Sequence, residues 1–384
     1  MLFLALLTAL APGADPPAPW REASALIERA VASRLFPGAV LVVGRRDTIL
    51  FSRGYGKLSW DRGAPRPDPA TTRWDLASLT KVVATTGAVM SLVDRGLLDL
   101  STPVSRILPE FTGRDKDAVT VRMLLNHTSG LPAFVPFYRR ASRREDVFEA
   151  LLAVPLEARP GSRVVYSDLN ALLLGLIVER LSGAPLDRFV DEAVFQPLGM
   201  GNTAFAVTDR TRVAPSIVLG GRAAPGVVSD PNARAMGGIA GHAGLFGTGL
   251  DLARYAQMWL AEGVSHGSTA PWVTAATVHS FLERTPDSGP RALGWDSPDL
   301  TDLERSAFGR KATATTYGHT GWTGTFLWFD PARDLFLVLL TNRSLGPNTT
   351  ASFRAMRELR GRLSDVVSAA AGSGCGAPRV IATC

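Results

Sequence analysis

Ser78 and Lys81 stand three residues apart in the segment Ser-Leu-Thr-Lys, a spacing that could support nucleophilic chemistry. Side chains at positions i and i+3 of a helix share one face, so a helix here would place the lysine amine beside the serine hydroxyl. Asp75 is the expected N-cap, which puts Ser78 in the first helical turn. A serine needs a nearby base to become a good nucleophile, and a lysine with a lowered pKa can be that base. An ordinary surface lysine is the alternative that this motif alone leaves open.

Tyr166-Ser167-Asp168 lies at the expected entry of an apolar helix. A phenol has a pKa of about 10, but beside a protonated lysine it could become a tyrosinate and act as a general base. Ser167 or Asp168 could instead be an ordinary helix N-cap. Taken alone, the segment favours the capping interpretation.

His319-Thr320-Gly321 leads into an expected strand. The glycine would let a ligand approach the backbone closely. The histidine could donate a hydrogen bond or carry charge near neutral pH. A histidine satisfied at a strand edge is the alternative interpretation.

The remaining motifs are less suggestive. Asn126-His127-Thr128 is predicted to form a turn rather than a catalytic part, and His242 either lines a cleft or packs within its glycine-rich loop. The five histidines show no His-x-x-x-His spacing, so we predict no metal. Residues 263–267 fit the Gly-x-Ser-x-Gly nucleophile elbow, but an amphipathic helix precedes them where that motif needs a strand.

The composition is typical of a chain that folds around a packed core, which could hold these candidate site residues in place. Of the 384 residues 46% are apolar and 20% charged, which excludes a disordered chain, a coiled coil and a fibre. The net charge is +6, but the 41 basic residues are dispersed and only four are lysines, so no nucleic-acid partner is predicted. No apolar stretch approaches the roughly 20 residues of a spanning helix, so no stable membrane span is predicted.

Each end of the chain predicts one helix and two strands. The predicted elements are a helix over 20–35, strands over 39–43, 48–52, 324–329 and 335–341, and a helix over 349–371. Between them, helical periodicity covers 78–96, 170–181 and 251–261. We therefore predict an α+β fold in which both chain ends build one antiparallel sheet with flanking helices, and a mostly helical region is inserted.

The predicted domains follow from this arrangement. Residues 16–62 and 305–372 are assigned to the sheet part, and residues 63–304 to the mainly helical inserted part. The loop from Asp209 to Arg234 has no periodicity. Because long structureless loops are often functional, we expect it to line a cleft.

Both termini are set apart from this fold. The apolar run from Leu2 to Ala11 is too short to span a bilayer but has the size of a signal-peptide core. Residues 1–14 are therefore the predicted signal segment of an exported, periplasmic or extracellular protein, with a hydrophobic or disordered tail as the alternative. Residues 373–384 are a predicted flexible tail, in which Cys375 and Cys384 are either bonded or free. Two cysteines exclude a disulfide scaffold.

The order of the motifs resembles the penicillin-recognising serine hydrolases: Ser-x-x-Lys, then Tyr-x-Asp about 90 residues later, then His-Thr-Gly near the end. Within these enzymes the chain is most similar to class C β-lactamase-like enzymes, penicillin-binding proteins and related esterases. Residues 120–132, 235–260 and 318–343 also resemble family segments, and the resemblance covers roughly residues 20–360. It implies a fold of the β-lactamase/transpeptidase type and no cofactor.

The resemblance also implies a role for each motif residue. Ser78 would be the acylated nucleophile, and Lys81 and Tyr166 would share the proton transfers. The backbone N–H groups of Ser78 and Trp322 would form the oxyanion hole, which is often the largest single catalytic contribution. The implied substrate-contacting residues are Asp168, His319, Thr320 and Gly321.

Two residues depart from the family pattern. Penicillin-directed members usually carry lysine where this chain has His319, and asparagine where it has Asp168. A neutral histidine holds a substrate carboxylate less well than an ammonium does, and an added carboxylate repels an anionic substrate. Both changes argue against strong β-lactamase activity. We hypothesise that Asp168 keeps Lys81 charged in the free enzyme.

The sequence therefore predicts an exported serine hydrolase that works through an acyl-enzyme on Ser78. Its substrate would be an ester or amide, either a small molecule or a D-amino-acid or peptidoglycan-derived compound. One alternative is a true β-lactamase or D,D-carboxypeptidase with the same machinery. The other is a non-catalytic protein that binds penicillin or wall peptides. The sequence leaves the oligomeric state open.

Overall fold

A five-stranded antiparallel sheet forms the framework of the structure. This computed structural model describes residues 15–141, 143–303 and 306–372. The strand order is β2-β1-β10-β9-β8. The strands are β1 (Gly38–Arg45), β2 (Thr48–Gly56), β8 (Tyr317–Thr320), β9 (Phe326–Asp330) and β10 (Leu335–Thr341). Because β1 pairs with β10 along its length, the two chain ends build one sheet, as the sequence predicted.

Helices cover both faces of this sheet. The helices α1 (Arg21–Ala32) and α11 (Thr350–Gly372) pack together on one face, and α9 (Gly249–Leu260) packs on the other. Successive side chains of a strand point to opposite faces. In β1, Leu41 packs with the terminal helices, whereas Val40 and Val42 join the larger core around α9. Burial on both faces explains why β1 and β10 are almost continuously apolar.

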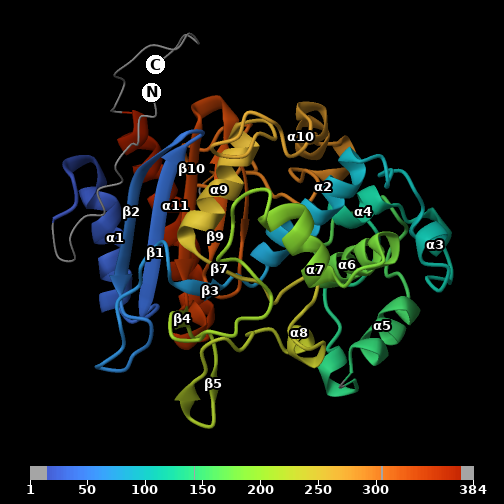
Figure 1. Ribbon diagram of the computed structural model, residues 1–384, viewed down its shortest axis with the longest axis horizontal. Coiled ribbons are helices and arrows are strands. Elements are labelled where there is room, and N and C mark those ends of the chain that lie inside the picture. Colours follow the sequence, from blue (N-terminus) through green and yellow to red (C-terminus); the bar gives the residue numbers. More distant parts are fainter. Residues whose placement is uncertain (1–14, 142, 304–305, 373–384) are drawn as a thin grey trace.

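The helical part lies beside the sheet, on the right in Figure 1. Its centre is α2 (Thr86–Asp94), which continues a π-helical turn (Lys81–Thr85) and packs against α6 (Asp168–Ser182). The other helices are α3 (Val104–Ile107), α4 (Val121–Leu125), α5 (Arg144–Ala153), α7 (Leu186–Val190) with a π-helical turn (Asp191–Phe195), α8 (Pro231–Ala235) and α10 (Ala275–Leu282).

Short strands join the two parts. The strands β3 (Arg73–Asp75), β4 (Val213–Ala214) and β7 (Phe246–Gly247) form a small sheet in the order β4-β3-β7. The strands β5 (Val218–Leu219) and β6 (Arg222–Ala223) form a separate hairpin within the long loop from Asp209 to Arg234. Neither sheet was predicted, because strands of two or three residues are too short to show a period.

The long elements confirm the fold class and the predicted helices. The domain boundaries stay a prediction. The expected signal segment and the cysteine-containing tail lie outside the described residues. Among the helices that the structure describes, none alone is long and apolar enough to cross a membrane. One pair bent by 79°, Asp168–Ser182 with Leu186–Phe195, meets that length and composition together.

Candidate active site

Ser78 lies in a turn between β3 and the helix that continues into α2. The expectation that Asp75 caps this helix is wrong, since Asp75 is the last residue of β3. Its buried carboxylate instead accepts hydrogen bonds from Ala77 N at 2.9 Å, Ser216 Oγ at 2.8 Å and Ser229 N at 2.7 Å. Ala77 has a positive φ of 48°, an uncommon conformation that turns the chain sharply just before the serine.

The structure confirms the predicted contact between Lys81 and Ser78. Its Nζ lies 3.0 Å from Ser78 Oγ, 3.0 Å from the His242 carbonyl oxygen and 2.7 Å from Asp168 Oδ1. Burial by itself would lower the pKa of Lys81, but the neighbouring Asp168 carboxylate and Tyr166 outweigh it, and the pKa lies above its ordinary value. Lys81 is therefore an ammonium that donates to three oxygen atoms.

Tyr166 is surrounded by cations and imidazole rings. Lys81 Nζ lies 5.1 Å from the ring centroid, and the Arg291 guanidinium lies 5.3 Å from it. The rings of His127 and His319 are centred 4.9 and 5.6 Å away. Ser167 is the N-cap of α6, because its side chain accepts a hydrogen bond from Leu169 N. The capping interpretation thus holds for Ser167, while Tyr166 precedes the cap and lines the cavity.

His127 and His319 are both neutral and have opposite tautomers. Burial, helped by the charges of Arg291 and Lys81, lowers the pKa of His319 to about 3 and that of His127 well below its usual range. His319 Nδ1 lies 2.8 Å from the Thr320 carbonyl oxygen, which can only accept, so Nδ1 carries the proton. His127 Nδ1 accepts from Ser167 N, so its proton is on Nε2. The low pKa of His319 argues against the interpretation of this histidine as charged near neutral pH.

Asn126-His127-Thr128 forms the predicted turn, since Thr128 Oγ1 donates to Asn126 Oδ1 at 2.7 Å. Its histidine packs on Tyr166 and so also borders the site. The predicted absence of a nucleophile elbow is consistent with Ser265, which follows α9 and donates to the Pro197 carbonyl oxygen. Ser265 is not in the cavity wall.

His242 and Asp230 form a second pair beside Lys81. His242 Nε2 lies 2.9 Å from Asp230 Oδ1. Burial alone would raise the pKa of Asp230, but His242 and, more weakly, Lys81 lower it to about 2. Asp168, Asp230 and His242 place one potential metal ligand each within 4.8 Å of one another. Asp168 is paired with Lys81, and Asp230 with His242. The absence of a metal stays a prediction.

The turn after β8 is tied to the segment before Ser78. Thr323 Oγ1 donates to the Asp75 carbonyl oxygen and Thr325 Oγ1 donates to that of Leu76, at 2.8 and 3.0 Å. Gly321 fits this close approach, because a Cβ there would lie 2.8 Å from the Leu76 oxygen. Within the described residues, the backbone N–H groups of Ser78 and Trp322 have no protein acceptor.

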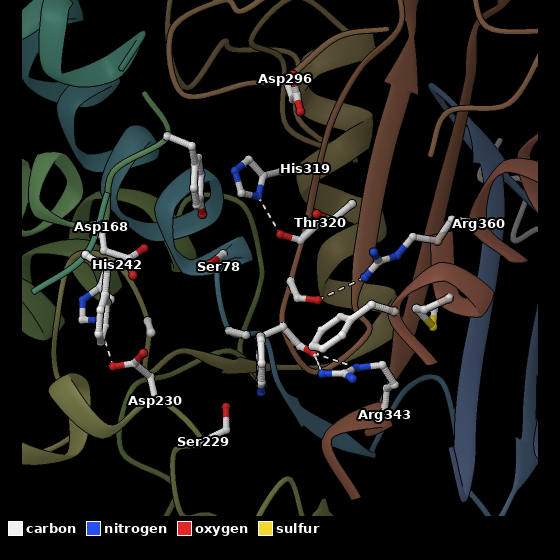
Figure 2. A pocket seen from close by; sticks show the side chains of 18 of the residues that line it. Ser78, Asp168, Ser229, Asp230, His242, Asp296, His319, Thr320, Arg343 and Arg360 are labelled. Atoms are coloured by element: carbon white, nitrogen blue, oxygen red, sulfur yellow. Dashed lines mark hydrogen bonds and ion pairs between the residues drawn. The ribbon is translucent and has the colours of Figure 1, made fainter. Parts of the chain in front are cut away.

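A cavity of about 680 Å³ collects these groups (Figure 2). Its wall includes seven of the eight predicted site residues: Ser78, Tyr166, Asp168, His319, Thr320, Gly321 and Trp322. The eighth, Lys81, is buried and contacts two of them, Ser78 and Asp168. The structure therefore brings the eight predicted residues together at one cavity, while the role of each stays a prediction.

His242, which was expected either to line a cleft or to pack within its loop, lies in the wall. Six further polar residues of the wall were not predicted as site residues: Ser229, Asp230, Arg291, Asp296, Arg343 and Arg360. The first two belong to the long loop that was expected to line a cleft, so that expectation is confirmed. Arg291 and Asp296 pair loosely at 3.5 Å. The arginines carried no sequence signal, because arginine is spread along the whole chain.

Comparisons with known proteins agree with this geometry. The family described as Beta-lactamase matches residues 23–360. N-acetylmuramyl-L-alanine amidase of Bacillus subtilis is 34% identical, over 85% of this chain and 81% of its own length. A putative D-alanyl-D-alanine carboxypeptidase of Salmonella agona is 32% identical, over 81% and 80%.

Solved structures show the same fold. A penicillin-binding protein homologue from Caulobacter crescentus superposes with a TM-score of 0.72 at 22% sequence identity, covering 93% of this chain and 99% of that one. The family match and the identity to the curated relatives extend over most of the chain. This chain therefore belongs to the beta-lactamase family and is a serine hydrolase with the family's α+β fold.

Proposed function

We propose that the chain hydrolyses an amide or ester bond of a peptidoglycan-derived substrate through an acyl-enzyme on Ser78. The observation that carries this proposal is the contact between Lys81 Nζ and Ser78 Oγ at the wall of the cavity. A hydroxyl held there is exposed to substrate and lies among charges that can stabilise the loss of its proton. The names of the curated relatives support a wall-derived substrate.

Tyr166 would accept the proton of Ser78. Lys81 cannot accept it in this state, since the ammonium already carries three protons. As Ser78 Oγ bonds to the substrate carbonyl carbon, its proton passes to the Tyr166 oxygen. Tyr166 would accept it in the tyrosinate form, whose negative charge the Lys81 ammonium and the Arg291 guanidinium would stabilise. Tyr166 then protonates the leaving amine or alcohol as its bond to the carbonyl carbon breaks.

A water molecule would then hydrolyse the acyl-enzyme, with Tyr166 again transferring the proton. Its oxygen bonds to the acyl carbon while Tyr166 takes its proton, and Tyr166 returns that proton to Ser78 Oγ as the bond between Oγ and the acyl carbon breaks. The N–H groups of Ser78 and Trp322 would stabilise the carbonyl oxygen as it gains negative charge in both steps. Their lack of a protein acceptor in the described residues supports this role. Each such donor is worth on the order of 3 kcal/mol of transition-state stabilisation.

The charges of the cavity favour an amide or ester over a penicillin. His319 is neutral, and so provides no ammonium for a substrate carboxylate. Asp168 adds a carboxylate to the wall, although Lys81 neutralises much of its charge. We therefore place an amide or ester without a carboxylate beside the scissile bond before benzylpenicillin. The names of the curated relatives give N-acetylmuramyl-L-alanine and a D-alanyl-D-alanine peptide as the wall-derived amides to test. His319, Thr320, Gly321 and Asp168 are the proposed substrate contacts.

We also propose that the protein is exported, because a peptidoglycan-derived substrate is found outside the cytoplasm. Residues 1–14 are the proposed signal segment. The test is a fusion of residues 1–20 to a reporter that is active only after export. Reporter activity that persists when Leu4 and Leu7 are replaced by Arg would contradict the proposal.

The function is tested by turnover of the three substrates and a short-chain p-nitrophenyl ester. Ser78→Ala should abolish turnover. Ser265→Ala is the matched control, because it removes a serine hydroxyl outside the cavity wall and should leave turnover unchanged. Binding without turnover by the wild type would favour the non-catalytic alternative, and turnover that survives in Ser78→Ala would exclude the proposed nucleophile.

A further inference from the structure

The turn that carries Trp322 is held by two arginines from distant parts of the chain. Arg360 of α11 donates through Nη2 to the carbonyl oxygens of Gly321 and Thr325, each at 3.0 Å. Arg343, which follows β10, donates through Nε and Nη2 to the Trp322 carbonyl oxygen at 3.1 and 2.9 Å. Figure 2 shows both guanidinium groups directed at this turn. The peptide units on both sides of Trp322 are therefore fixed by charged donors.

The turn already has backbone hydrogen bonds of its own. Gly321 N donates to the Thr325 carbonyl oxygen at 2.8 Å, and Gly324 N donates to that of Gly321 at 3.0 Å. These bonds close the turn without any side chain. The two arginines are thus additional to what the turn needs to keep its shape.

The surroundings of the Arg343 and Arg360 guanidinium groups disfavour a positive charge. Arg343 is 1% exposed, and burial together with the charge of Arg343 lowers the pKa of Arg360 to about 9. Among the residues that the structure describes, neither guanidinium has a carboxylate within ion-pairing distance. Aromatic rings offset part of the cost: Arg343 Cζ lies 4.2 Å from the ring centroid of Phe353, and Arg360 Cζ lies 5.8 Å from that of Phe326. Burial of a charge without a carboxylate partner is still costly, and a neutral amide could donate to a carbonyl oxygen without that cost. The positive charge itself therefore needs a reason.

The geometry of the peptide bond gives a reason for a charged donor at this position. Gly321 C=O and Trp322 N–H belong to the same planar trans peptide unit and point in opposite directions. A donor fixed on the oxygen side therefore fixes the direction of the N–H on the other side. A charged donor also polarises the amide, which makes the N–H a stronger hydrogen-bond donor. Arg343 binds the next peptide unit, so it can orient Trp322 but does not polarise the same amide.

We propose that Arg360 is a positioning residue that orients and polarises the Gly321–Trp322 peptide, and so strengthens the Trp322 N–H as an oxyanion donor. This inference rests on the proposed function, because the oxyanion forms only if Ser78 attacks a carbonyl carbon. Arg360 lines the cavity wall, but in this role it acts through the peptide unit rather than by contact with the substrate. A purely structural latch would instead affect folding and leave the chemical step of the folded protein unchanged.

Three substitutions separate charge, hydrogen bonding and structure. Arg360→Gln keeps a donor but removes the charge, Arg360→Lys keeps the charge, and Arg360→Met removes both. Arg357→Met is the matched control, because Arg357 is an exposed arginine one turn earlier on α11. The readouts are kcat and KM for a short-chain p-nitrophenyl ester, and the affinity of an alkyl boronic acid, whose tetrahedral adduct mimics the oxyanion.

We expect kcat to fall about 10- to 100-fold in Arg360→Met and Arg360→Gln while KM changes less than about twofold. Boronate affinity should fall by a similar factor, since it follows transition-state binding. Arg360→Lys should recover at least a third of the lost kcat, and Arg357→Met should match the wild type. If Arg360→Met does not fold, Arg360→Gln and Arg360→Lys carry the same comparison.

The results distinguish this inference from the proposed function. Wild-type protein that is not acylated on Ser78 overturns both. Wild-type protein that is acylated, with kcat and boronate affinity unchanged in folded Arg360→Gln and Arg360→Met, overturns only the role of Arg360. A lower melting temperature with unchanged kcat identifies Arg360 as a structural latch and also overturns the role.

Discussion

The Asp168 carboxylate lies 2.7 Å from the Lys81 ammonium, in a site where the lysine is 4% exposed. Burial disfavours the charged lysine, and Asp168 is the larger of the two neighbours that reverse this effect. The residue that departs from the family pattern therefore contacts the lysine of the Ser-x-x-Lys motif and raises its pKa. The hypothesis that Asp168 keeps Lys81 charged is consistent with this geometry, and the first prediction tests it.

Asp168→Asn should destabilise the protein at pH 7. It should also change how the free energy of unfolding depends on pH, because Lys81 would then have a lowered pKa instead of a raised one. Without the carboxylate, burial lowers the pKa of Lys81, so the unfolded state binds more protons than the native state. Stability of the variant should then rise with pH between about 7 and 10, by at most about 1.4 kcal/mol per pH unit. In the wild type the raised pKa of Lys81 gives no such rise.

Urea unfolding of both proteins at pH 7, 8 and 9 measures this difference. The loss at pH 7 should be about 3 kcal/mol, the lower end of the cost of removing one partner of a buried ion pair, because the Asp168 side chain is 19% exposed and water can reach this position. Equal slopes of stability against pH in the two proteins would show that Asp168 does not control the charge of Lys81.

His319 should stay neutral through the physiological pH range. Because burial and the nearby cations lower its pKa to about 3, the unfolded state takes up a proton below about pH 6.5 that the native state does not. His319 therefore makes the fold less stable as pH falls from about 6.5 toward 3. An NMR titration of the His319 ring protons, assigned with His319→Gln, should show no inflection between pH 5 and 8. An inflection there would contradict the neutral assignment.

Tyr166→Phe should remove the proton acceptor while keeping the ring between its neighbours. General acid–base catalysis typically contributes 10²- to 10⁴-fold, so kcat for the short-chain ester should fall within that range. KM should change little, because the ring contacts with His127 and His319 remain. Stopped-flow measurement of the acylation step gives the answer directly. Acylation at the wild-type rate would assign the proton transfer to another group.

Restoring the two family residues should increase reaction with penicillin. The double variant Asp168→Asn, His319→Lys replaces a carboxylate by an amide and a neutral imidazole by an ammonium in the same cavity wall. We expect acylation by benzylpenicillin to speed up at least about tenfold, the effect of roughly 1.4 kcal/mol from one charged hydrogen bond. The single variants indicate which change is responsible. A double variant no faster than the wild type would show that these residues do not exclude penicillin.

Much of the fold could be predicted because its main elements have strong periods and clear ends. The runs that became β1, β2, β9 and β10 are apolar and bounded by turns, and α1 ends at Ala32, a few residues before the Pro37-Gly38 stop signal. The small sheet around β3 was missed because two or three residues cannot show a period. This omission explains the wrong role given to Asp75, whose carboxylate is satisfied by Ala77, Ser216 and Ser229 rather than by a helix end.

The site was predictable where local spacing determines a contact. Ser78 and Lys81 are one helical turn apart, so their contact follows from the sequence. The pairing of Asp168 with Lys81 depends on how α6 packs against the helix after Ser78, which no local pattern reveals. Arg291, Arg343 and Arg360 reach the cavity from the far part of the chain, and nothing in their neighbours separates them from the other arginines.

Intact-mass spectrometry after rapid acid quench is the most direct test of the acyl-enzyme. Purified protein lacking residues 1–14 is mixed with a p-nitrophenyl ester, quenched, and digested to locate the adduct. The account predicts one acyl group on Ser78 of the wild type and of Ser265→Ala, and none on Ser78→Ala. An adduct on another residue, or ester turnover that persists in Ser78→Ala, would contradict it.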